Sequence, residues 1–100
     1  MPLPSDLSSE PFDEVIAKRL IRHILEDESL GFTKHARDEM RKDSLDTTDI
    51  VNVLRAGWME GAAEMKNRAW RYRLMTNRMS VIVTFRSVTE AVVVTAWRES

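Results

Sequence analysis

Residues 70–98 decide the fold, and they read WRYRLMTNRMSVIVTFRSVTEAVVVTAWR. In this stretch β-branched and aromatic side chains alternate with their neighbours at a period of two, which is typical of β-strands. The alternating runs are residues 70–75, 81–86 and 92–97. Turn-forming residues separate them, at Asn77-Arg78 and at residues 87–90, so neighbouring strands are predicted to form antiparallel hairpins. A weaker strand is predicted over residues 58–65.

Upstream of this stretch the period changes to that of a helix. A first helix is predicted to begin near Pro11, which a first helical turn tolerates, and to end at Gly31. His23 follows the apolar side of this helix, so we expect it at the boundary of the core. The apolar side consists of Phe12, Val15, Ile16, Leu20 and Ile24.

Two shorter helices are predicted to follow, each with a recognisable cap. Thr33 can cap a helix that runs to about Lys42, because its hydroxyl can accept a hydrogen bond from a free backbone N–H. Asp46 can cap the next one, with Asp49 three residues later in an imperfect capping box, and Gly57 ends it. Helices grouped before strands indicate an α+β fold, in which N-terminal helices pack on a C-terminal antiparallel sheet of three or four strands.

Composition limits the class of protein. The 100 residues suit one domain, which we place at residues 11–100 after a flexible lead at residues 1–10. An apolar fraction of 43% and a charged fraction of 31% indicate a globular chain. The absence of cysteine excludes disulfides and thiolate chemistry. The lead lacks the basic start of a signal peptide, and no apolar run approaches the roughly 20 residues of a membrane helix, so we expect a cytoplasmic protein.

Charge is distributed unevenly along the chain. The net charge is −1, yet residues 66–100 alone carry +5 and residues 1–30 carry −4. Such asymmetry can mark a phosphate-binding surface. The alternative is that the C-terminal arginines pair with the acidic N-terminal helix.

The sequence lacks the motifs of several enzyme classes. Its three glycines are isolated, so no nucleotide-binding loop exists, and there is no Gly-x-Ser-x-Gly elbow. The two histidines, His23 and His35, are twelve positions apart on different predicted helices. We therefore expect neither a metal nor an organic cofactor.

Basic residues on the predicted strands leave one chemistry open. Arg71 and Arg73 are two apart and so share a face of their strand; with Arg86 on that face, the sheet would present a cationic surface. A metal-free ribonuclease needs such cations and groups that transfer protons, for which His35 or Tyr72 are candidates. Trp97 is a candidate for stacking on a base.

Each of these residues also has a structural interpretation. Tyr72 can pack in the core beside its same-face neighbours, and His35 can pack at its helix start against a backbone carbonyl. Arg71 and Arg73 can lie on a solvated sheet face, and Trp97 can lie in the core or at an edge.

Three segments resemble a known family. Residues 32–41, FTKHARDEMR, resemble the opening hxxHAxxRM signature of the DUF4258 family, and residues 44–57, SLDTTDIVNVLRAG, resemble its S-x-x-D-[IV]-x-x-[IV]-L-x-x-G helix. The strands from Tyr72 to Arg98 resemble its final meander. The resemblance covers about residues 32–98.

The resemblance implies a fold similar to the small RelE, MqsR and BrnT ribonuclease toxins. It implies metal-free cleavage of mRNA and inhibition by a cognate antitoxin protein. The signature histidine falls on His35, and its basic position falls on Arg41, because Glu39 stands where the family more often has arginine. The basic and aromatic strand positions of the family fall on Tyr72, Arg73, Arg86 and Arg98. Tyr72, Arg73 and Arg86 are the catalytic candidates. Arg98 is an RNA-binding candidate, as are Arg71 and Trp97 from the strand pattern.

Two hypotheses therefore follow. The first is a ribonuclease toxin of a type II toxin–antitoxin system that binds RNA and an antitoxin. The second is a non-catalytic protein-interaction module, or a homodimer, on the same scaffold. The acidic segment before Gly31 can cover the basic sheet, extend the core or pair chains.

Overall fold

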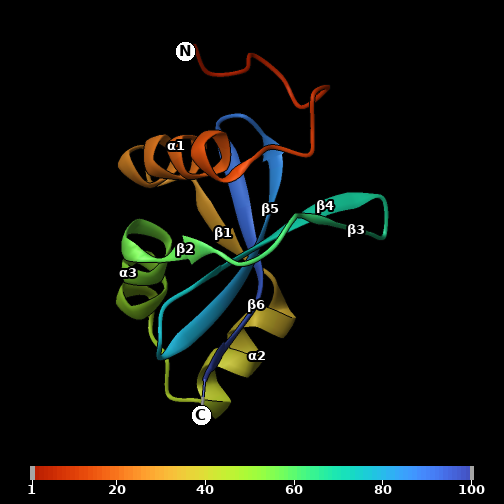
Figure 1. Ribbon diagram of the computed structural model, residues 1–100. Coiled ribbons are helices and arrows are strands. Elements are labelled where there is room, and N and C mark those ends of the chain that lie inside the picture. The colour runs from red at the N-terminus through yellow and green to blue at the C-terminus, as the bar shows by residue number, and fades with distance from the viewer. Residues whose placement is uncertain (1, 100) are drawn as a thin grey trace.

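The computed structural model of the protein describes residues 2–99 (Figure 1). Along the chain it has one helix, a short strand, two helices and five further strands. The helices are α1 (Glu14–Glu26), α2 (Lys34–Lys42) and α3 (Thr47–Ala56). The strands are β1 (Leu30–Phe32), β2 (Trp58–Met59), β3 (Glu64–Lys66), β4 (Ala69–Met75), β5 (Met79–Ser87) and β6 (Glu90–Arg98). The α+β class predicted from the sequence is confirmed.

The sheet is larger than the sequence predicted, and it is mixed. Its six strands follow the order β1-β6-β5-β4-β2, with β3 also paired to β4. The hairpins β4–β5 and β5–β6 are antiparallel as predicted, whereas β1 runs parallel to β6. The predicted count of three or four strands was wrong because β1 has only three residues, too few to show a period, and Gly31 resembled a helix stop.

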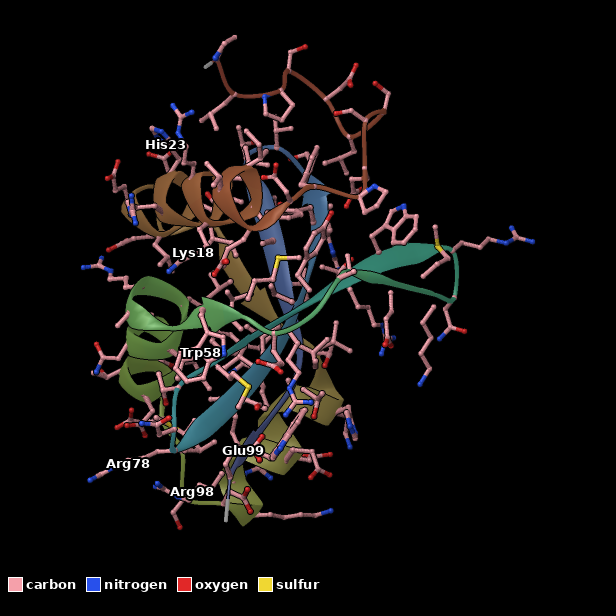
Figure 2. The ribbon with its side chains drawn as sticks, viewed as in Figure 1. Lys18, His23, Trp58, Arg78, Arg98 and Glu99 are labelled. Atoms are coloured by element: carbon pink, nitrogen blue, oxygen red, sulfur yellow. The ribbon has the colours of Figure 1, made fainter. Side chains whose placement is uncertain are left out.

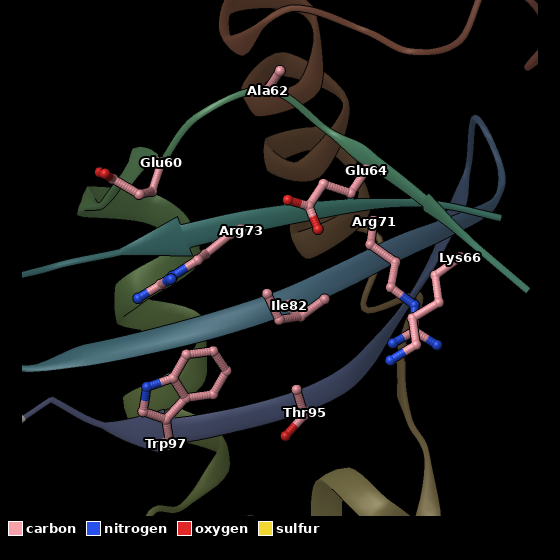
Figure 3. A pocket seen from close by; sticks show the side chains of 9 residues that line it. All are labelled: Glu60, Ala62, Glu64, Lys66, Arg71, Arg73, Ile82, Thr95 and Trp97. Atoms are coloured by element: carbon pink, nitrogen blue, oxygen red, sulfur yellow. The ribbon is translucent and has the colours of Figure 1, made fainter.

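The helices cover one face of the sheet. Helices α1 and α3 pack against each other on that face, and in Figure 3 they lie behind the strands. Helix α2 instead continues from β1 along β6, where the N–H of Thr33 donates to the carbonyl oxygen of Val93 at 3.0 Å. Within residues 2–99, no helix lies over the opposite face of the sheet, which we call the open face.

The core lies between the sheet and the helices α1 and α3. The sheet contributes alternate residues such as Tyr72, Leu74 and Val83, all with no exposed surface. Helix α1 contributes Ala17, Leu20, Ile21, Ile24 and Leu25. The acidic N-terminal helix therefore extends the core. Truncating one of the large buried residues to alanine is expected to cost about 2–5 kcal/mol.

Part of the predicted apolar side of α1 was wrong. Val15 is 62% exposed, and the His23 side chain projects away from the core, where it lies 3.9 Å from Glu26 (Figure 2). The buried side of α1 includes Ala17 and Ile21, each one position after Ile16 and Leu20 of the predicted side. Leu3 and Leu7 of the predicted lead also pack against the core.

The predicted starts of α2 and α3 are confirmed, whereas α1 begins at Glu14, after its cap Asp13, and not near Pro11. The Thr33 hydroxyl accepts from the N–H of Ala36 at 2.9 Å. Asp46 and Asp49 complete their capping box, each side chain accepting from the other residue's N–H at 2.9 Å. Each cap satisfies backbone donors that a helix leaves unpaired.

One irregularity in β6 changes which side chains reach the open face. Ile82 pairs with Thr95 while Val83 pairs with Val93, so Val94 is a bulge residue without a partner on β5. The extra residue breaks the simple alternation that the sequence suggested for residues 92–97. As a result Ala96 joins the core, whereas Thr95 and Trp97 face the same side as Ile82.

Candidate functional site

The open face carries a hollow of about 350 Å³. Its floor comes from the three central strands, and its wall comes from the segment that joins β2 to β3 (Figure 3). The lining residues are Glu60, Ala62, Glu64, Lys66, Arg71, Arg73, Ile82, Thr95 and Trp97. We call this space the hollow. It holds cations, carboxylates and an indole ring around an apolar floor.

One end of the hollow is an ordered cluster around Glu99. A single carboxylate oxygen, Oε1, accepts hydrogen bonds from the Ser80 hydroxyl at 2.5 Å, the Arg73 guanidinium at 2.8 Å and the Trp97 indole N–H at 3.0 Å. Ser80 is fully buried, so its hydroxyl is fixed. These donors, the Ser80 hydroxyl first, hold the pKa of Glu99 below its ordinary value, because each stabilises the ionised form.

Arg73 also lies over an aromatic ring. Its guanidinium carbon is 5.1 Å from the centroid of the Trp97 ring, within the range of a cation–π contact. Arg73 therefore has its charge paired with Glu99 and one of its faces against an indole. Figure 3 shows both side chains at the same end of the hollow, with Glu60 on the facing wall.

The other end of the hollow is cationic. Arg71 and Lys66 extend to the same side there (Figure 3). Glu64 lies across the β3–β4 pair from Arg71, as its register partner. Among residues 2–99, no ion pair within 4.0 Å involves Arg71, Lys66 or Glu64. This end can therefore offer two cations and a carboxylate to a ligand.

A comparison with protein-family models places the chain. Residues 32–98 match the model described as a domain of unknown function, DUF4258. The chain belongs to the DUF4258 family. The matched region includes every residue of the hollow and leaves α1 outside. No curated protein and no solved structure matches the chain.

Tyr72 does not reach the hollow. It is fully buried on the covered face, where its ring packs at 5.1 Å from that of Phe85. Its hydroxyl donates to Glu10 at 2.7 Å and accepts from the N–H of Phe12 at 3.0 Å. Burial is the main cause that raises the pKa of Tyr72 above its ordinary value. These contacts agree with the structural interpretation, in which Tyr72 packs in the core.

The two residues assigned from the DUF4258 signature lie on the surface of α2. His35 is exposed and does not line the hollow. Arg41 is also exposed, with its guanidinium 3.6 Å from Asp38 on the same helix. Helix α2 runs along β6 instead of over the open face, so the helix carries both residues away from the hollow.

The last two arginines assigned from the sequence are used elsewhere. Arg86 lies beside β1, in a depression shared with Gly31 and Val92, and is 4.0 Å from Glu90. Arg98 lies against the C-terminal end of α2, where its Nε donates to the carbonyl oxygen of Asp43 at 2.7 Å. Neither the Arg86 nor the Arg73 ion pair involves α1, so the predicted pairing of the arginines with the acidic helix was wrong for both.

The structure therefore brings together three of the residues proposed from the sequence: Arg71, Arg73 and Trp97. It adds Glu60, Glu64, Lys66 and Glu99, which sequence reasoning missed as site residues. Lys66 began the basic run and could have been found. The carboxylates carried no signal, because they lie on a loop, a short strand and beyond β6.

Two further findings concern metals and membranes. Within residues 2–99, no three histidine or acidic side chains gather closely enough to hold a metal ion. None of the helices in that range has both the length and the apolar character that crossing a membrane would need.

Proposed function

We propose that this DUF4258 protein is an RNA-cleaving toxin that uses the hollow, without a metal ion, and is inhibited by a cognate antitoxin. The supporting observation is that Lys66, Arg71 and Arg73 line one open space together with an indole ring and carboxylates. Guanidinium and ammonium groups bind phosphates, and an aromatic ring beside them suits a nucleobase. The proposal thus keeps the activity expected from the sequence and moves its site.

Glu64, Arg71 and Lys66 can supply the three parts of the reaction. The Glu64 carboxylate accepts the proton of a ribose 2′-OH, and the 2′-oxygen attacks the adjacent phosphorus. Arg71 stabilises the charge that grows on the phosphorane oxygens. Lys66 donates a proton to the leaving 5′-oxygen as the P–O5′ bond breaks. The products are a 2′,3′-cyclic phosphate and a 5′-hydroxyl.

Purified protein and labelled RNA test this proposal. We expect the wild-type protein to cleave the RNA, and Glu64→Gln and Arg71→Ala to slow cleavage about a hundredfold or more, the usual scale for one catalytic group. Arg78→Ala is the matched control, since Arg78 is an exposed arginine at the β4–β5 turn that does not line the hollow, and its side chain extends outward (Figure 2). Intact RNA at large enzyme excess, from folded protein, would refute the enzymatic proposal.

Growth of a bacterial host tests the toxin part of the proposal. Induction of the wild-type protein should arrest growth, and induction of Arg71→Ala should not. An antitoxin that covers the open face should restore growth and protect Lys66 from chemical acetylation. Continued growth with folded wild-type protein would remove the toxin role but leave RNA cleavage to the assay above.

A second function, that of a non-catalytic binding module, is favoured by one observation. Arg73 is already paired with Glu99 at 2.8 Å, as expected of an arginine that supports a surface instead of a reaction. RNA that binds tightly and stays intact would favour this function. A stable dimer in solution that hides the open face would favour a homodimer.

A further inference from the structure

Arg73 differs from the other two cations of the hollow. Its side chain is held on two sides, by Glu99 at 2.8 Å and by the Trp97 ring at 5.1 Å. Its Nε and one of its terminal nitrogens also donate to the Ser80 hydroxyl, at 3.3 Å and 3.1 Å. Several of its donors are therefore engaged within the protein.

Arg73 nevertheless keeps an accessible surface. Its side chain is 37% exposed and lines the hollow. The edge of the Arg73 guanidinium is hydrogen-bonded, and one of its flat sides rests on the Trp97 indole. Its other flat side can still contact a ligand. A guanidinium plane stacks on nucleobases, as aromatic rings do.

A phosphate would gain little at Arg73. The adjacent Glu99 carboxylate is ionised at neutral pH, because its pKa lies below the ordinary value, so the pair carries no net charge. Arg71 and Lys66 have no such partner within 4.0 Å among residues 2–99, and they keep their charge for a ligand. The end with the Arg73–Glu99 pair, where Glu60 stands on the facing wall, therefore has no net positive charge and is flat, whereas Arg71 and Lys66 make the other end cationic.

We propose that the hollow binds single-stranded RNA in one orientation, with an unpaired base stacked on the Arg73–Trp97 pair and its phosphate on Arg71 and Lys66. This inference rests on the proposed function, since it assumes that RNA enters the hollow. Double-stranded RNA is excluded as the substrate because its bases are stacked on one another and offer no free face.

Salt dependence separates the two roles. For single strands, each phosphate contact contributes about 0.7 to the slope of log K against log salt concentration. Binding of a fluorescein-labelled oligouridylate, followed by anisotropy, should therefore lose about 0.7 of slope in Arg71→Gln and in Lys66→Gln. The double variant Arg73→Gln/Glu99→Gln removes two opposite charges at once. It should weaken binding about tenfold, the scale of one lost base stack, and leave the slope unchanged.

An abasic RNA of the same length is the second probe. Because this RNA has no bases, wild type and the double variant should bind it with equal affinity, whereas Arg71→Gln should bind it more weakly. A duplex of the same sequence should bind at least tenfold more weakly than the single strand. Circular dichroism of each variant confirms that it is folded.

The outcomes distinguish the two proposals. Wild-type protein that binds no RNA overturns both. Suppose that wild-type protein binds and cleaves RNA, but the double variant has a smaller salt slope than wild type or binds abasic RNA more weakly. This result overturns the stacking role and leaves the proposed function standing. Equal affinity for duplex and single strand also overturns the inference.

Discussion

The hydroxyl group of Tyr72 donates a hydrogen bond of 2.7 Å to Glu10, which joins strand β4 to the segment that leads into α1. The same hydroxyl accepts the N–H of Phe12, two residues further along that segment, at 3.0 Å. Burial raises the pKa of Glu10 more than this hydrogen bond lowers it. Tyr72 therefore fastens the N-terminal segment over the edge of the core and lies apart from the hollow.

Tyr72→Phe should lower stability and leave RNA binding unchanged. The variant keeps the ring contacts but leaves the buried N–H of Phe12 without its acceptor, which is expected to cost about 1–3 kcal/mol. Urea unfolding followed by tryptophan fluorescence measures the cost. A tenfold loss of RNA cleavage at unchanged stability would show instead that the hydroxyl takes part in the reaction.

Arg98→Ala should also lower the stability of the fold and leave RNA binding unchanged. Arg98 closes the end of α2 through the carbonyl oxygens of Asp43 and Ser44, at 2.7 Å and 3.2 Å. Because these contacts are exposed, we expect a loss of about 1 kcal/mol in unfolding free energy. The salt slope of RNA binding should stay as in the wild type. A slope reduced by about 0.7 would make Arg98 a phosphate ligand after all.

Glu99→Gln should remove part of the acid sensitivity of the fold. The folded protein holds the pKa of Glu99 below its ordinary value of 4.5. The stabilisation is therefore complete above pH 4.5 and is lost as the pH falls through the lower, folded-state pKa. The wild type should melt at a higher temperature than the variant at pH 7, and the difference between the two melting temperatures should shrink as the pH is lowered below 4.5. A constant difference across this range would contradict the assignment.

Gly57→Ala should lower the stability of the fold more than Gly61→Ala does. A Cβ at this position would lie 2.6 Å from the carbonyl oxygens of both Met75 and Val53, which are backbone atoms. We expect a loss of about 1–3 kcal/mol, the scale of overpacking. Gly61→Ala is the matched control: Gly61 has a φ of 71° but open space around it, so only backbone strain of about 1 kcal/mol applies. Thermal unfolding ranks the two.

His35→Ala should leave RNA cleavage within about twofold of the wild type, since the site proposed for general acid–base work does not include it. Initial cleavage rates over pH 5–8 check this expectation. A rate that falls by two orders of magnitude, or that loses the pH dependence of the wild-type rate, would bring α2 into the reaction.

The features that could be predicted from the sequence are those with local causes. Thr33 and Asp46 cap helices through bonds to residues three positions away, so their role is visible in the order of residues. The hairpin at Asn77-Arg78 joins neighbouring strands in the same way. Such contacts require no knowledge of the rest of the fold.

The features that escaped prediction depend on distant partners. Leu30 finds its place only against Ala91, some sixty residues later, and nothing in a three-residue strand reveals that pairing. The bulge at Val94 shifts the side chains that follow it, and it alone puts Thr95 and Trp97 on the open face. Glu99 became part of the site through Ser80 on another strand. Arg71 and Arg73 were found because they share one strand.

The parallel pairing of β1 with β6 has a consequence for the order of folding. Strand β6 lies between β1 and β5, so the last of these six strands to be synthesised is an interior strand of the sheet. Until residue 98 has left the ribosome, β1 lacks the whole of the strand with which it pairs, and contacts so distant in sequence slow the search for the native state. The nascent chain therefore cannot complete the hollow until β6 has supplied Thr95 and Trp97.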